Sequence, residues 1–161
     1  MAVRRAVPES DQWLDDYGEK HREVRFPGIY WASVLLLVIG TVGVLWALPV
    51  PAEFARISPF LNWGSAFLMA ALIYYFIISI ALAIGMLPFV VGVSALQVWL
   101  VGSPWPQPRI ALLTLAVSLC GLYLGHLSRG GVRAVFRDIQ LMMIAPVFLL
   151  SNLYRRLGIP F

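Results

Sequence analysis

The chain has 161 residues, of which 60% are hydrophobic and only 12% are charged, and its mean hydropathy is +0.82. A soluble domain of this length exposes much of its surface and cannot hide so many apolar side chains from water. The composition therefore excludes a soluble globular domain and predicts an integral membrane protein. The net charge of +4 does not indicate nucleic-acid binding, because the basic residues lie in short segments between apolar runs and form no single basic face.

The first 28 residues precede the first apolar run and are expected to form a cytoplasmic segment at the membrane surface. Ser10 and the acids that follow it predict a helix that continues to about Glu23. Trp13, Tyr17 and His21 are spaced four residues apart, so they share one face of that helix. The helix either rests on the membrane with its aromatic rings among the headgroups or also presents His21 to a binding site.

The remaining sequence predicts an all-α fold, a polytopic transmembrane helical bundle of about four spans in a single domain. The predicted spans cover approximately residues 29–48, 60–80, 86–101 and 110–126. A tight turn around residues 81–88 is expected to separate the second span from the third, because one apolar run is too long for a single crossing. The last apolar segment, 139–153, is short and contains Pro146, which predicts a half-span or an interfacial helix.

Small residues in the spans predict where helices approach closely, because tight packing drives helix association in lipid. The candidates are Gly40, Gly43, Gly64 and Ser65. The single cysteine, Cys120, lies in an apolar run and is expected to be a small core residue.

The distribution of Lys and Arg predicts the orientation in the membrane. The N-terminal segment holds five of them and the loop after the fourth span holds three, whereas Arg56 and Arg109 stand alone in the other two loops. Basic residues collect on the cytoplasmic side, so both termini are expected to be cytoplasmic. The compact chain without a retention tail favours a bacterial inner membrane.

That topology brings the only two histidines, His21 and His126, to the same face of the membrane. Imidazole pairs suit iron, zinc or copper, and non-haem Fe(II) sites combine histidines with a carboxylate. The alternative is two interfacial histidines bonded to backbone or lipid headgroups. The spans carry no charged residue, which argues against a coupled transporter and favours a protein that handles membrane lipid.

Short motifs spread over nearly the whole chain occur in the same order in one family of small membrane proteins. They are "WLDDYGEKH", "VLWALPVP" at Val44–Pro51, "NW" at Asn62-Trp63, "ALAIGML", "GH" at Gly125-His126, "DIQ" and "IAP". The chain thus resembles a family long catalogued as being of unknown function, whose fungal members are 2-hydroxy fatty acid dioxygenases of phytosphingosine degradation.

The resemblance implies α-oxidation, in which an Fe(II)-dependent enzyme uses O2 to shorten a 2-hydroxy fatty acid by one carbon. It assigns catalysis and iron binding to His21 and His126. The chain departs from the family at Tyr30, which stands in place of a second histidine, and at Phe26, which stands in place of an asparagine. Tyr30 is the third candidate ligand, although a phenol is a poorer ligand than imidazole at neutral pH.

Two further departures lie after His126. Arg129 replaces a glutamate of the family and Arg133 replaces a proline, and neither guanidinium can bind a metal. Both arginines are candidates to bind the carboxylate or phosphate of a substrate headgroup through paired hydrogen bonds. The alternative function is a catalytically inactive lipid-binding or scaffolding protein of the same fold. A channel or transporter subunit has less support, because no ring of polar residues lines the spans.

Overall fold

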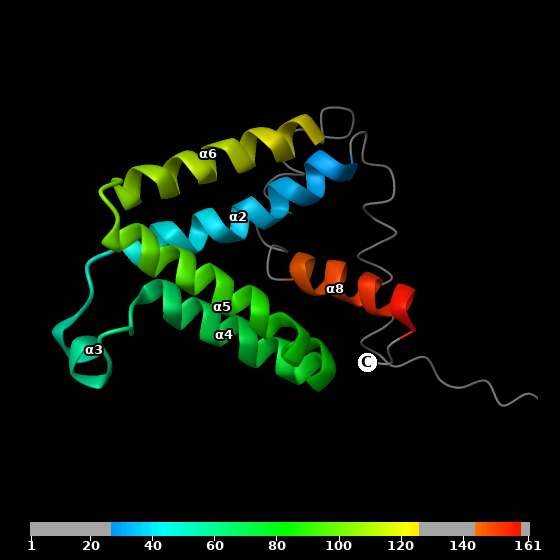
Figure 1. Cartoon of the computed structure of the whole chain (residues 1–161), viewed down its shortest axis with the longest axis horizontal. Coiled ribbons are helices and arrows are strands. Elements are labelled where there is room, and N and C mark those ends of the chain that lie inside the picture. Colours follow the sequence, from blue (N-terminus) through cyan, green and yellow to red (C-terminus); the bar gives the residue numbers. More distant parts are fainter. Residues whose placement is uncertain (1–26, 126–143, 159–161) are drawn as a thin grey trace, which may run out of the picture.

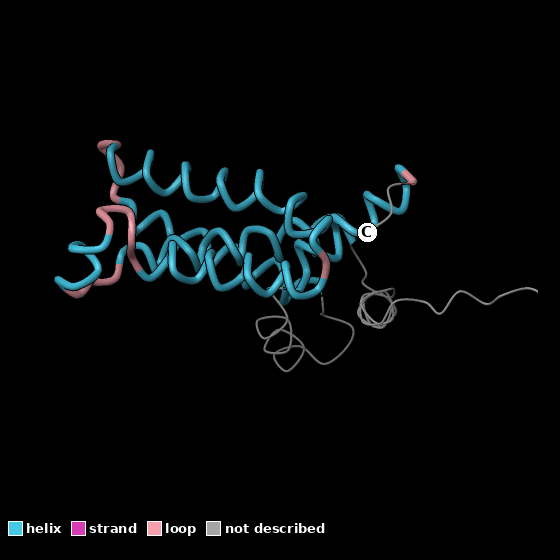
Figure 2. Tube along the Cα trace, turned by 90° about the horizontal axis from the view of Figure 1, so that it is seen from below, coloured by secondary structure: helices cyan, strands magenta, loops and turns pink. Residues whose placement is uncertain are grey.

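The computed structural model describes residues 27–125 and 144–158. Within this part of the chain the fold is all-α, with six helices (Figures 1 and 2). The helices are α2 (Pro27–Ala47), α3 (Ala52–Ile57), α4 (Trp63–Ile78), α5 (Ile80–Gly102), α6 (Gln107–Gly125) and α8 (Ile144–Leu157).

Three of these helices, α2, α5 and α6, are long and apolar enough to cross a membrane. The outer surface of these helices is apolar as well, since large side chains such as Val91 and Leu113 are more than 60% exposed. Exposing so much apolar surface to water is unfavourable, whereas contact with lipid is not. The three helices therefore indicate a multi-pass membrane protein. The 16 residues of α4 make a shorter apolar helix, about 24 Å long.

The break between α4 and α5 lies at Ser79. The prediction of a tight turn around residues 81–88 is wrong, because these residues are part of α5. Ser79 alone is extended, with φ −163° and ψ 131°. Pro88 lies inside α5. A proline removes one helical hydrogen bond and does not have to end a helix that is packed among neighbours in a membrane. Arg56, expected in a loop, belongs to the short helix α3, which also contains Glu53.

The successive long helices α2, α4, α5 and α6 alternate in direction, so the bundle has two distinct ends (Figure 1). We call them the Ser79 end and the α3 end. The Ser79 end holds the start of α2, the break between α4 and α5, and the end of α6. The α3 end holds α3 and the connection from α5 to α6. Figure 1 shows α2 beside α6, α4 beside α5, and α8 between these two pairs at the Ser79 end.

Helices α2 and α6 approach so closely that their backbones almost touch. A Cβ on Gly40 would lie 2.9 Å from the backbone nitrogen of Leu115, and a Cβ on Gly43 would lie 2.8 Å from the Cβ of Ala111. The antiparallel contact continues toward the Ser79 end, where Gly121 leaves room for the side chain of another α2 residue, Ser33. Small residues thus set the α2–α6 interface, as expected for helices that pack in lipid.

Gly64 has the same role between α4 and α2, because a Cβ there would lie 2.9 Å from the carbonyl oxygen of Val42. The predictions for Gly40, Gly43 and Gly64 are therefore confirmed. Ser65 instead forms a capping box with Asn62 at the start of α4. The backbone amide of Ser65 donates to Asn62 Oδ1 at 3.0 Å, and the Ser65 hydroxyl accepts from the backbone amide of Asn62 at 2.9 Å. The prediction for Cys120 is wrong, because this residue is exposed on α6.

Replacing Gly40 with alanine is expected to lower the free energy of unfolding by about 1–3 kcal/mol, because the added methyl group meets backbone that cannot move aside. Gly92 on α5 is a matched control, since a Cβ there has no atom within 4 Å. Unfolding in detergent measures both variants. Equal stabilities of Gly40→Ala and Gly92→Ala would contradict the close α2–α6 contact.

Candidate functional site

Four of the five predicted site residues belong to segments that join the bundle at its Ser79 end. Residues 1–26 precede Pro27, where α2 begins, and residues 126–143 follow Gly125, where α6 ends. His21, His126, Arg129 and Arg133 lie outside the described residues, so the metal site and the headgroup site remain predictions.

Tyr30, the fifth predicted site residue, is described and is completely buried. It lies in the first turn of α2 and belongs to a core cluster with Val34, Leu122 and Val147. Its ring packs edge-on against Trp31, with 5.0 Å between the ring centroids. Tyr30 therefore packs inside the bundle at the Ser79 end, where the segments that contain His21 and His126 join the described helices.

Helix α8 packs against the Ser79 end through its apolar half. The ring of Phe148 stacks on Trp31 with the centroids 5.4 Å apart. Gly85 of α5 leaves the space that Leu150 and Tyr154 of α8 occupy. The 14 residues of α8 extend for only about 21 Å, which is short of the hydrocarbon thickness of a bilayer.

The helix α8 also differs from the apolar segment predicted at 139–153. Pro146 is the third residue of the helix, a position where its missing amide costs no helical hydrogen bond. The helix continues past the apolar segment, so Arg155 and Arg156 form its last turn. Both arginines are exposed.

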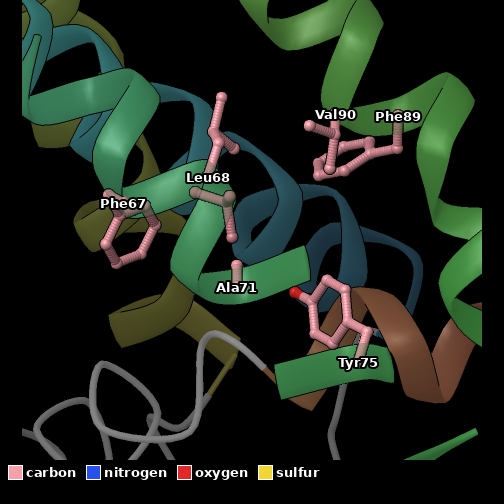
Figure 3. A pocket seen from close by; sticks show the side chains of 7 residues that line it. Phe67, Leu68, Ala71, Tyr75, Phe89 and Val90 are labelled. Carbon is pink, nitrogen blue, oxygen red and sulfur yellow. The ribbon is translucent and has the colours of Figure 1, made fainter. Parts of the chain in front are cut away.

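A small apolar pocket lies between α2, α4 and α5 (Figure 3). Its cavity volume is about 10 Å³, which is room for about one water molecule. The lining residues are Val38, Phe67, Leu68, Ala71, Tyr75, Phe89 and Val90. Leu68, Ala71 and Tyr75 follow each other on the inner face of α4, and Phe89 and Val90 come from α5 across the pocket.

The α3 end contains a polar contact that the sequence did not reveal. Gln107 Nε2 donates to the carbonyl oxygen of Gly43 at 2.9 Å and to Gln97 Oε1 at 3.0 Å. Both glutamine side chains are buried. The contact joins α2, α5 and α6, and we call it the glutamine clasp. A single Gln97 inside an otherwise apolar run was the available signal, since a polar side chain buried in a membrane protein needs a partner.

Residues 27–125 and 144–158 contain no group of three or more His, Cys, Asp or Glu side chains that could hold a metal ion. No protein-family model, curated protein or solved structure matches the chain. The resemblance to the dioxygenase family therefore rests on the sequence motifs alone.

Replacing Gln97 and Gln107 with leucine, singly and together, tests whether the glutamine clasp holds three helices. Each single variant is expected to lose about 0.6–2 kcal/mol of stability, the range for hydrogen bonds between membrane helices. The double variant is expected to lose less than the sum, because each single change leaves the other amide without its partner. Strictly additive losses in detergent unfolding would show that the two side chains act independently.

Proposed function

We propose that this protein is an Fe(II)-dependent oxygenase that shortens 2-hydroxy fatty acids by one carbon at the cytoplasmic face of a bacterial inner membrane. The observation that carries the proposal is the position of residues 27 and 125 at one end of the bundle. The segments that contain His21 and His126 start from that end. Four consecutive crossings by α2, α4, α5 and α6 would keep both segments on the same side of the membrane.

The distribution of charge supports this orientation. Residues 1–26 hold five Lys and Arg, residues 126–143 hold three, and α8 adds Arg155 and Arg156. All of these segments join or pack against the Ser79 end. Among the residues that the structure describes, Arg56 and Arg109 lie at the α3 end. The positive-inside rule then makes the Ser79 end and both termini cytoplasmic.

Aromatic residues support a membrane boundary at the α3 end. Four of the six tryptophans lie in or beside the helix ends that meet there, namely Trp46, Trp63, Trp99 and Trp105. Tryptophan is enriched where hydrocarbon meets headgroups. Trp63 is held in place, because its indole nitrogen donates to the carbonyl oxygen of Pro49 at 3.0 Å.

The proposed iron ligands are His21 and His126, with Tyr30 as the third candidate. Bound iron would supply the activation of O2. The chemistry balances with one O2 for each substrate molecule: a 2-hydroxy acid yields the acid shorter by one carbon, CO2 and water. Arg129 and Arg133 would hold the substrate carboxylate with charge-assisted hydrogen bonds. This pairing would keep the carboxyl end at the membrane surface while the chain stays among the helices.

One observation favours the second candidate, a lipid-binding or scaffolding protein without catalysis. Tyr30, which stands where the family has a histidine, is completely buried in a cluster of apolar side chains. Such an environment suits a packing residue better than a metal ligand. The iron content of the protein separates the two candidates.

Cysteine labelling tests the orientation in intact cells. In a Cys120→Ser background, Ile57→Cys is expected to react with a membrane-impermeant maleimide from outside, and Leu157→Cys is expected to react only after permeabilisation. Both positions are more than 60% exposed, so they are matched in accessibility. The reverse pattern would put the histidine segments on the outer face and contradict the proposed topology.

Iron analysis of protein purified in detergent and reconstituted anaerobically with Fe(II) tests the metal site. The wild type is expected to bind about one iron per chain, and His126→Ala is expected to bind none, because imidazole is the ligand that holds iron in such sites. Arg156→Ala, at the same end of the bundle, serves as the control that keeps its iron. A wild type without iron would leave the lipid-binding candidate.

A further inference from the structure

The outer face of α8 combines leucines with an arginine. Leu153, Arg156 and Leu157 are three and four residues apart, so they lie on one side of the helix. Leu153 is 50% exposed, Leu157 is 62% exposed, and Arg156 is exposed as well. Another side of α8, with Val147 and Ser151, is completely buried against the bundle. Exposed leucines beside an arginine are typical of a helix face that contacts lipid, because the long arginine side chain reaches the headgroups.

The contacts of α8 show how deeply it sits in the bundle. Phe148 stacks on Trp31, the fifth residue of α2, and Tyr154 occupies the space beside Gly85, the sixth residue of α5. Both contacts lie about 6–8 Å from the starts of helices that are long enough to cross a membrane. Figure 1 shows the last turn of α8 beyond the ends of α2 and α5. The last turn of α8 is therefore at the level where hydrocarbon gives way to headgroups.

The last turn of α8 also concentrates positive charge. Arg155 and Arg156 are adjacent in the chain, and both are exposed. The helix ends directly after them, where Gly158 adopts a φ of +69° and its amide donates to the carbonyl oxygen of Arg155 at 3.3 Å. In α3, by contrast, Arg56 follows Glu53 by three residues, so a carboxylate partly offsets its charge. An anion is therefore attracted more strongly to the last turn of α8 than to α3.

We propose that the last turn of α8 binds the headgroup of an anionic phospholipid from the surrounding bilayer. Arg155 and Arg156 bind the phosphate through charge-assisted hydrogen bonds, while Leu153 and Leu157 contact the acyl chains. A phospholipid supplies both groups, whereas free phosphate would leave the leucines without an apolar partner. Phosphatidylcholine fits less well than phosphatidylglycerol, because its choline cation offsets the phosphate charge. The bound lipid is a component of the bilayer and not a substrate, so the proposal does not depend on the oxygenase.

Native mass spectrometry of the protein in detergent, titrated with phosphatidylglycerol, tests the arginines. Arg155→Gln combined with Arg156→Gln is expected to raise the dissociation constant by about thirtyfold, which corresponds to about 2 kcal/mol for two arginines near anionic lipid. Arg56→Gln combined with Arg109→Gln is the matched control, because it removes the same charge from two exposed arginines at the α3 end. The control is expected to bind phosphatidylglycerol like the unmodified protein.

Three results of this titration would overturn the proposal. Equal losses in the two double variants would show that net charge alone attracts the lipid. Equal affinity of the unmodified protein for phosphatidylglycerol and phosphatidylcholine would show that the headgroup charge is not recognised. Displacement of phosphatidylglycerol by inorganic phosphate would indicate a site for a free anion. The last two measurements use the unmodified protein, so they decide even if the arginine variant fails to fold.

Spin labelling in nanodiscs that contain phosphatidylglycerol tests where the outer face of α8 lies. In a Cys120→Ser background, one nitroxide is attached at Leu153→Cys. A second, at Leu113→Cys on α6, provides the reference for lipid contact, because Leu113 is 65% exposed. Both labels are expected to collide more often with oxygen, which dissolves in hydrocarbon, than with a water-soluble nickel complex.

Two other patterns at Leu153 would overturn the proposal. A label that mainly the nickel complex reaches lies in water. A label that neither reagent reaches is covered by another part of this chain or by a second copy of it.

Discussion

The near contact between the backbones of α2 and α6 is the constraint on which the rest of the bundle depends. Lipid offers no hydrophobic driving force for helix association, so the helices are held by close packing and by a few hydrogen bonds. Gly40 and Gly43 let the two helices meet at close range, and the carbonyl oxygen of Gly43 also accepts a hydrogen bond from the glutamine clasp. Val42, on another face of α2, contacts α4 at Gly64. Helix α2 is thus the shared support for all the other long helices.

The antiparallel packing of α2 and α6 decides where the two chain segments that carry the histidines join the bundle. Pro27, where α2 begins, and Gly125, where α6 ends, lie at the same end. This geometry would bring histidines that are about a hundred residues apart in sequence to one surface without any long connection. Helix α8 packs against the same end, where Phe148 stacks on Trp31 of α2 (Figure 1).

Sequence reasoning succeeded where the type of residue alone indicates a feature, and it failed where the feature depends on which neighbours a residue meets in the fold. Apolar runs predicted the membrane helices, and the small residues Gly40 and Gly64 predicted close contacts. The break at Ser79 was missed because Gly85 and Pro88 are stronger local helix breakers than serine, yet packing keeps both inside α5. Cys120 was misplaced because a side chain that faces lipid is as apolar as one in the core, so hydrophobicity cannot distinguish the two faces.

The candidate site was predictable only in part. The position of Tyr30 near the start of the first span followed from the sequence, whereas its burial against Trp31 and beside Leu122 required the fold. The pocket was not predictable, because it depends on how α2, α4 and α5 pack against one another. The partner of Gln97 was equally hidden, since Gln107 belongs to another helix.

The unequal lengths of α4 and α5 have a consequence for the surrounding bilayer. With 16 residues against 23, α4 falls short of the usual hydrocarbon thickness by about 6 Å, whereas α5 exceeds it. A helix of this length crosses a bilayer only where the lipids beside it shorten, which creates a local hydrophobic mismatch on one side of a protein. Bilayer thickness is therefore expected to affect the packing around α4 more than the packing around α5.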